Sequence, residues 1–211
     1  PLACGLGARR GGRARCVGDP GRESRRLPVH VHDRALLAEE PASGEVRRVA
    51  LDDVSLEIEQ GQFASIVGKS GSGKSWGVGL MLEQMRFHGV RFIVLDPVGT
   101  HSGIAQMEGV QFHAVQKGIS VGRFVEYILE HDLNVVVNLR GLTFEDQRHF
   151  VRLFAEYLYR WNKEFGPRHL VIEEVQQFAP QQGKSEAKEI LQVLSTMGRM
   201  EGIGLSVVTQ R

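Results

Sequence analysis

Short apolar runs alternate with amphipathic stretches along the chain from residue 63 onward. The apolar runs predict β-strands at FASIV (63–67), RFIVLD (91–96), VQFHAV (110–115), LNVVVNL (133–139), RHLVIEE (168–174) and GLSVVTQ (204–210). Between them, apolar residues at helical spacing predict helices at 74–88, 121–131, 143–161 and 185–200. Near-continuous apolar strands that alternate with helices indicate a mostly parallel sheet covered by helices on both faces.

The longest predicted helix has both a start signal and an apolar face. Thr143 is followed three residues later by Asp146, which is typical of a capping box. Large apolar side chains then recur at helical spacing, at Phe150, Phe154, Leu158 and Trp161. We expect this face to pack against the sheet rather than to bind a cofactor.

The sequence before residue 63 follows other patterns. Residues 1–27 are rich in Gly and Arg and lack periodicity, so we expect a disordered or non-native tail. Residues 28–62 are expected to form an extended lead-in, because VALDDVSLEIEQGQ (49–62) alternates like a strand or hairpin. His30 and His32 fall on one face of this segment, but two histidines alone are weak evidence for a metal site.

Composition and charge narrow the class of protein. With 211 residues, 42% of them hydrophobic, the chain can form one domain with a real core. A net charge of +1 gives no global basic field for nucleic acid. No apolar run approaches the roughly 18 residues that span a bilayer, and the start lacks a signal-peptide core. The two cysteines, Cys4 and Cys16, lack zinc-ligand spacing, so we expect a reduced, cytoplasmic protein.

A glycine-rich loop after the first apolar run carries the clearest chemical signal. The stretch GKSGSGKS fits the pattern GxxxxGK(S/T) and lies between a predicted strand and a predicted helix. Such a loop turns backbone N–H groups toward phosphate oxygens, which predicts ATP and Mg²⁺ as cofactors. Lys74 should reach the β- and γ-phosphates, and Ser75 should hold the metal. The predicted nucleotide-binding residues are Gly68, Lys69, Ser70, Gly71, Ser72, Gly73, Lys74, Ser75 and Trp76.

Acidic and polar residues at two other strand ends complete the predicted site. Glu173 follows the apolar run at 170–172, where a P-loop protein places the carboxylate that supports the metal. Glu174 stands where a base that polarises the attacking water belongs. Gln210, at the tip of the last strand, is predicted to hydrogen-bond the γ-phosphate or that water. We therefore expect Glu174, Lys74 and Gln210 to carry the catalysis.

Two residues near this site have two interpretations each. Asp96 ends a strand and either orients water around Mg²⁺ or caps the turn that follows. Trp76 either packs or stacks on adenine, and packing is the preferred interpretation.

One stretch of the chain resembles the ABC-transporter ATPases. ALDDVSLEIEQGQFASIVGKSGSGKS (50–75) is similar to the start of such a domain. That family also carries an LSGGQ-type signature before its acidic strand, and a His after the strand that follows. Neither is present here, and the acidic strand ends Glu-Glu rather than Asp-Glu-Pro.

From residue 49 to 211 the chain resembles the HerA/FtsK-type ATPases, specifically the HerA-like branch. The segments FIVLDPVGTHSGI, NVVVNLRGLTFEDQRHFVRLFAEYLY, LVIEEVQQFAP and MGRMEGIGLSVVTQR carry this resemblance. It implies a three-layer P-loop NTPase sandwich with a RecA/ASCE-like sheet over 63–211. It also implies that this domain is truncated at its C-terminus, because the family usually continues beyond the final Gln-Arg.

The resemblance also implies a mechanism and partners. The implied function is that of a hexameric ring motor whose ATP hydrolysis drives translocation or unwinding of double-stranded DNA. A nuclease is among the partners that the resemblance implies. An arginine from the next subunit would complete each site, and Arg140, Arg199 and Arg211 are candidates. Three alternatives stay open: an ABC-type transporter ATPase, a conjugation or secretion motor, and a nucleotide switch without turnover.

Overall fold

The computed structural model describes residues 4–5, 63–183 and 185–210. The predicted lead-in, with His30 and His32, lies outside these residues, as does all of the predicted tail except Cys4 and Gly5. The strands are β1 (Cys4–Gly5), β2 (Phe63–Gly68), β3 (Arg91–Asp96), β4 (Val110–Ala114), β5 (Asn134–Asn138), β6 (Arg168–Ile172) and β7 (Ile203–Gln210). The six apolar runs that predicted strands therefore all form strands.

Within the described residues, four α-helices and four short 3₁₀ helices lie between the strands from β2 to β7. The α-helices are α1 (Lys74–Phe87), α2 (Val121–Glu130), α3 (Phe144–Trp161) and α4 (Glu186–Met197). The 3₁₀ helices are η1 (Ser102–Gln106), η2 (Asn162–Glu164), η3 (Val175–Gln177) and η4 (Gly198–Glu201). The helix predicted over 185–200 is α4 with η4 directly after it, because the last turn tightens at Gly198.

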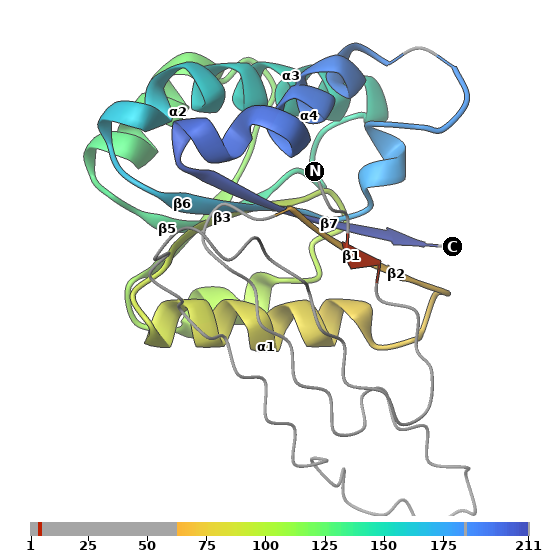
Figure 1. Cartoon of the computed structure of the whole chain (residues 1–211), viewed down its shortest axis with the longest axis horizontal. Helices are drawn as coiled ribbons and strands as arrows, with labels where there is room; N and C mark the ends of the chain where they lie inside the picture. The colour runs from red at the N-terminus through yellow and green to blue at the C-terminus, as the bar shows by residue number, and fades with distance from the viewer. Residues whose placement is uncertain (1–3, 6–62, 184, 211) are drawn as a thin grey trace, which may run out of the picture.

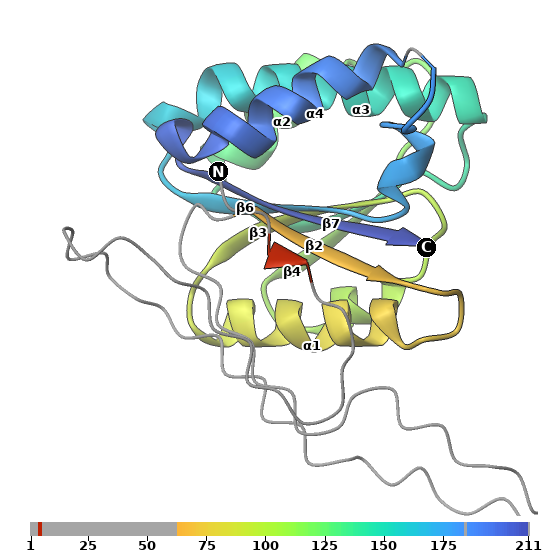
Figure 2. The same ribbon diagram turned by 45° about the vertical axis from the view of Figure 1, so that its right-hand side comes forward.

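The strands form one sheet in the order β1-β2-β7-β6-β3-β5-β4, and each neighbouring pair is parallel. Figure 1 shows α1 on one face of the sheet and α2, α3 and α4 on the other. The same three layers are visible after rotation (Figure 2). The predicted parallel sheet with helices on both faces is thus confirmed.

Each face of the sheet has its own apolar core. Buried side chains of α2, α3 and α4 pack against one face, with Phe150, Phe154 and Leu158 of α3 among them. Buried side chains of α1, including Met81 and Met85, pack against the other face. Central strands are therefore apolar on both sides, which explains the near-continuous hydrophobic runs in the sequence.

The start of α3 follows the predicted capping pattern. The backbone N–H of Asp146 donates to Oγ1 of Thr143 at 3.2 Å, and that hydroxyl donates to Oδ2 of Asp146 at 2.7 Å. The Thr143 hydrogen bond is the main reason that the pKa of the Asp146 carboxyl lies below its usual value. This cap fixes where the chain leaves the β5 end of the sheet and enters the helix.

Candidate functional site

The glycine-rich loop joins β2 to α1 at the carboxyl edge of the sheet. Gly73 caps α1 in the left-handed conformation, with φ 82°, which a residue with a side chain rarely adopts. Nζ of Lys74 donates to the carbonyl oxygens of Gly68 and Lys69, both at 2.8 Å. These bonds hold the ammonium group over its own loop, where an anion would also be held by the amino end of α1.

Strand order brings the other predicted residues to this same edge. β7 lies between β2 and β6, and Gly68 pairs with Gln210 in the sheet register. Glu173 and Glu174 follow the last residue of β6. The backbone N–H of Glu173 donates to the carbonyl oxygen of Leu95 at 3.1 Å, which extends the β6–β3 pairing by one residue. The carboxyl ends of parallel strands thus gather residues from three distant segments.

Glu174 has a strained backbone and a carboxylate held from two sides. Its φ of 50° is in the left-handed region, which costs a non-glycine residue roughly 1–3 kcal/mol. Nε2 of Gln210 donates to Oε1 of Glu174 at 2.5 Å, and Nε2 of Gln176 donates to Oε2. The sequence predicted a separate catalytic role for each of Gln210 and Glu174, and the structure brings the two side chains into contact. Gln176 was missed, although it lies two residues after Glu174.

Glu173 is buried and paired with a histidine that the sequence analysis did not single out. Its relative exposure is 2%, and that of His101 is 3%. Nε2 of His101 lies 2.5 Å from Oε1 of Glu173. The two residues are 72 positions apart, so no local pattern joins them. The quoted segment FIVLDPVGTHSGI contains His101, and its position after a strand is the only signal that could have found it.

Asp96 caps the turn that leads from β3 to His101. Its Oδ1 accepts from the N–H groups of Val98 at 3.1 Å and Gly99 at 2.7 Å. Its Oδ2 accepts from the N–H of His101 at 2.8 Å. The turn-capping interpretation of Asp96 is therefore confirmed.

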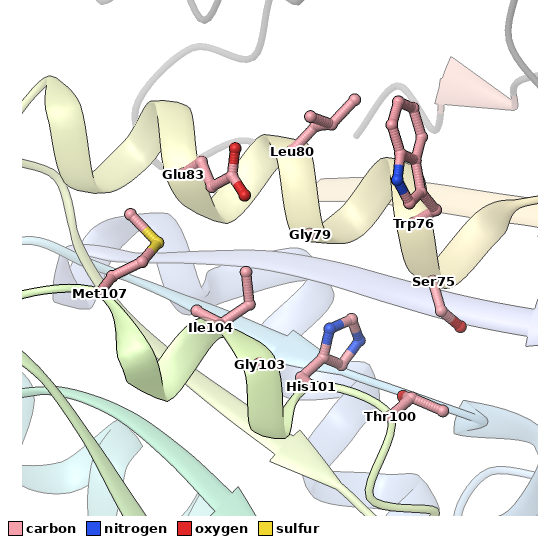
Figure 3. Close-up of a pocket in the computed structure, with 10 residues that line it drawn as sticks. All are labelled: Ser75, Trp76, Gly79, Leu80, Glu83, Thr100, His101, Gly103, Ile104 and Met107. Carbon is pink, nitrogen blue, oxygen red and sulfur yellow. The ribbon is translucent and has the colours of Figure 1, made fainter. Parts of the chain in front are cut away.

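A pocket of about 380 Å³ lies between α1 and η1, next to the glycine-rich loop. Figure 3 shows Ser75 and Trp76 of α1 on one side of it, with Thr100 and His101 on the other. Trp76 is 43% exposed and does not pack into either core. The indole is therefore a wall of this pocket, which differs from the preferred interpretation of Trp76 as a packing residue.

The three candidate arginines are placed differently. Arg140 follows β5 at the same edge as the glycine-rich loop, and its N–H donates to Oδ1 of Asn138 at 2.9 Å. Arg199 belongs to η4, which precedes β7 and therefore lies at the amino edge, opposite the loop. Both are exposed. Arg211 lies outside the described residues.

The residues at the carboxyl edge suit a magnesium ion bound together with phosphate. Within the described residues there is no cluster of three or more His, Cys, Asp or Glu that could hold a metal alone. Mg²⁺ does not need one, because it is usually bound by one or two carboxylates, several waters and the substrate's phosphates. A buried carboxylate at Glu173 and a hydroxyl at Ser75 fit that donor set.

Residues 53–201 match the family described as "Helicase HerA, central domain". The chain belongs to this family. The resemblance to HerA/FtsK-type ATPases is thereby confirmed, and the ABC-type alternative is not favoured. The HerA-type chain, with its glycine-rich loop after β2, shares its α/β fold with a solved protein of similar structure.

Solved structures of other proteins are similar to this chain. VirB4 of Thermoanaerobacter pseudethanolicus is similar with a TM-score of 0.57 and 12% identity, over 75% of this chain and 74% of that chain. The genome packaging NTPase B204 of Sulfolobus turreted icosahedral virus 2, in complex with ATP-gammaS, has a TM-score of 0.47 and 20% identity. That match covers 71% of this chain and 64% of the packaging NTPase. No curated protein matches the chain.

Among the described helices, none has the length and apolar character required to cross a membrane.

Proposed function

We propose that this HerA-type domain hydrolyses ATP with Mg²⁺ and, as a hexameric ring, uses the energy to translocate double-stranded DNA. One observation carries the ATP-hydrolysis part of the proposal, while the ring and the DNA substrate rest on the family resemblance. The sheet order β2-β7-β6 places the glycine-rich loop, Gln210 and the Glu173–Glu174 pair at neighbouring strand ends. That arrangement combines a phosphate cradle, a residue that can sense the γ-phosphate and two carboxylates in one site.

The first part of the mechanism is binding. Backbone N–H groups of residues 68–76 surround the phosphates, and Lys74 exchanges its two carbonyl partners for phosphate oxygens. Ser75 and Glu173 would hold Mg²⁺, with Glu173 acting directly or through water. When bound, Mg²⁺ neutralises charge that develops on the phosphoryl oxygens. Trp76 lies beside this cradle as part of the predicted nucleotide-binding set.

The second part is the transfer of a proton from water. Glu174 accepts a proton from the water that attacks the γ-phosphoryl group in line. Gln210 hydrogen-bonds Glu174 in the described structure, so an amide that contacts the γ-phosphate also contacts the base. We infer that Gln210 reports the presence of the γ-phosphate to Glu174.

A ring would supply the remaining positive charge. Arg199 lies at the amino edge of the sheet, so it can act only on the site of a neighbouring subunit. Arg140 lies at the carboxyl edge and could serve its own site instead. We therefore favour Arg199 over Arg140 as the residue that acts in trans, with Arg211 as a further candidate. The double-stranded DNA substrate, the nuclease partner and the cytoplasmic location stay predictions.

Two substitutions test the ATPase chemistry. Lys74→Ala should weaken ATP binding, because a charge-assisted contact to the β- and γ-phosphates is lost. Glu174→Gln should preserve binding and abolish measurable turnover, because an amide cannot accept the proton from water. Nucleotide affinity is measured by fluorescence with labelled ATP, and turnover by phosphate release. Turnover that survives in Glu174→Gln would show that another residue is the base.

A further inference from the structure

His101 is a buried imidazole to which the chemistry described above gives no role. It lies on the turn between β3 and η1, whereas its partner Glu173 follows β6. Both side chains are almost fully buried, with exposures of 2% and 3%. Nε2 of His101 donates to Oε1 of Glu173 across 2.5 Å. A buried carboxylate that receives such a bond loses much of its freedom to rotate.

The position of the imidazole is itself fixed by a rigid turn. Oδ2 of the buried Asp96 accepts from the backbone N–H of His101 at 2.8 Å. Within the turn, Gly99 has φ 87°, and a Cβ there would lie 3.1 Å from Nδ2 of Asn138. Asn138 at the end of β5 thus packs closely against the turn, and the bonds to Asp96 hold its backbone, so the turn can keep His101 in one place.

The same imidazole faces the nucleotide side of the molecule. His101 and Ser75 line one pocket between η1 and α1, as Figure 3 shows. His101 thus lines the same pocket as the proposed hydroxyl ligand of the metal and bonds the proposed carboxylate ligand. The side-chain partner of this imidazole is Glu173, whereas the carboxylate of the proposed base Glu174 is bonded by Gln176 and Gln210.

We propose that His101 is a positioning residue for the metal-supporting carboxylate, an inference that rests on the proposed Mg²⁺-dependent ATPase function. By donating to Oε1, His101 fixes the rotamer of Glu173 and leaves Oε2 for the ion or for its water. Loss of such a partner around a metal ligand typically lowers metal affinity by about 10- to 100-fold. Asp96 thus holds the backbone of His101, and His101 holds Glu173, so the end of β3 is connected to the proposed metal ligand through two hydrogen bonds.

A purely structural role for His101 makes a different prediction. If the imidazole only satisfies a buried carboxylate, its loss lowers thermal stability and leaves the Mg²⁺ requirement unchanged. If His101 positions Glu173, its loss also raises the Mg²⁺ concentration that nucleotide binding requires. His169 provides a matched control, because it is also a buried histidine and its Nε2 bonds Oγ of Ser206 at 2.8 Å.

The test uses the full 211-residue chain and fluorescent ATPγS as the probe. The readout is the Mg²⁺ concentration that half-saturates nucleotide binding, with melting temperature measured in parallel. His101→Leu should raise this concentration about tenfold or more, as expected for a lost partner of a metal ligand. His101→Gln, which keeps an N–H donor, should recover most of the wild-type value. His169→Leu should lower the melting temperature without moving the Mg²⁺ requirement.

The outcomes separate this inference from the function on which it rests. Glu173→Gln must itself raise the Mg²⁺ requirement; if it does not, the assigned metal ligand is wrong and the proposed function fails at that point. If Glu173→Gln raises it while His101→Leu binds Mg²⁺ and nucleotide like the wild type, only the positioning role is overturned. In the Glu173→Gln background, the further change His101→Leu should add less than about threefold, because coupled residues are not additive.

A second measurement covers the case in which His101→Leu prevents folding. Nitrogen NMR of the histidine-labelled wild-type protein follows each imidazole directly. Addition of Mg²⁺ to the ATPγS-bound protein should shift the His101 Nε2 resonance and leave the His169 resonance in place. An unchanged His101 resonance at saturating Mg²⁺ would overturn the proposal without any variant.

Discussion

Glu174 combines an unfavourable backbone with a carboxylate held by two amides. A left-handed Glu persists only where its surroundings over-determine it, and Gln176 and Gln210 provide that restraint. The strain is stored at the residue proposed to take the proton, which is where functional sites commonly store it. Glu174→Gln is therefore a specific test of this residue, because the Gln side chain keeps the shape of Glu and removes only its ability to accept a proton.

A second residue gives a pH-dependent prediction. Burial lowers the pKa of His169 to about 4, from an ordinary value of 6.5. The unfolded chain therefore binds a proton between pH 6.5 and 4 that the native protein does not bind. Stability from this group is fully present above pH 6.5 and is lost as the pH falls toward 4, by roughly 3 kcal/mol in total.

His169→Gln tests this directly. The amide can still bond Ser206 but does not titrate, so the free energy of unfolding should fall less steeply between pH 6.5 and 4.5 than in the wild type. Urea unfolding at several pH values measures the difference. Equal slopes for the two proteins would mean that His169 is not held neutral in the native state.

At the scale of elements, the start of α3 can be tested for its contribution to stability. Thr143→Ala removes the side-chain oxygen that accepts from the N–H of Asp146, which should cost about 1 kcal/mol of unfolding free energy. Thr143→Ser keeps the hydroxyl and should stay within a few tenths of a kcal/mol of the wild type. A denaturant titration that finds Ala and Ser equivalent would show that the cap contributes nothing.

The elements themselves were largely predictable, because periodicity and burial are linked. Strands buried on both faces give continuous apolar runs, and α3 gives a repeating apolar face. The turn from Pro97 to His101 and the short helix η3 gave no such signal, since neither repeats. Both carry partners of the carboxylates, namely His101 and Gln176. His101 and Glu173 are 72 positions apart, so their contact depends on the order of the strands in the sheet. The periodicity of the sequence carries no information about that order.

Part of the candidate site could likewise be predicted from the sequence, and part could not. Lys74 and Ser75 follow from a local motif, and Glu173, Glu174 and Gln210 follow from their places at strand ends. That these residues lie close together follows only from the strand order β2-β7-β6. The exposed position of Trp76 did not follow from the sequence, because an aromatic residue next to such a motif suits either packing or a pocket wall.

For the whole molecule, the two edges of the sheet carry different chemistry. The carboxyl edge holds the proposed nucleotide site, and the amino edge presents the exposed Arg199. A subunit that offers a site at one edge and an arginine at the other can join head to tail with copies of itself. Such heterologous contacts close into a ring when the rotation between subunits permits it. The placement of Arg199 at the edge opposite the proposed nucleotide site is thus one observation that supports the ring proposal.

The most direct test of the central claim is the steady-state rate of ATP hydrolysis with and without long double-stranded DNA. A ring motor that moves along DNA should hydrolyse ATP several-fold faster when DNA is present, and Glu174→Gln should be inactive in both conditions. Salt titration would separate true stimulation from weak electrostatic binding, which falls steeply with ionic strength. A wild-type rate that DNA leaves unchanged, in a protein shown to form rings, would contradict the proposal that double-stranded DNA is the substrate.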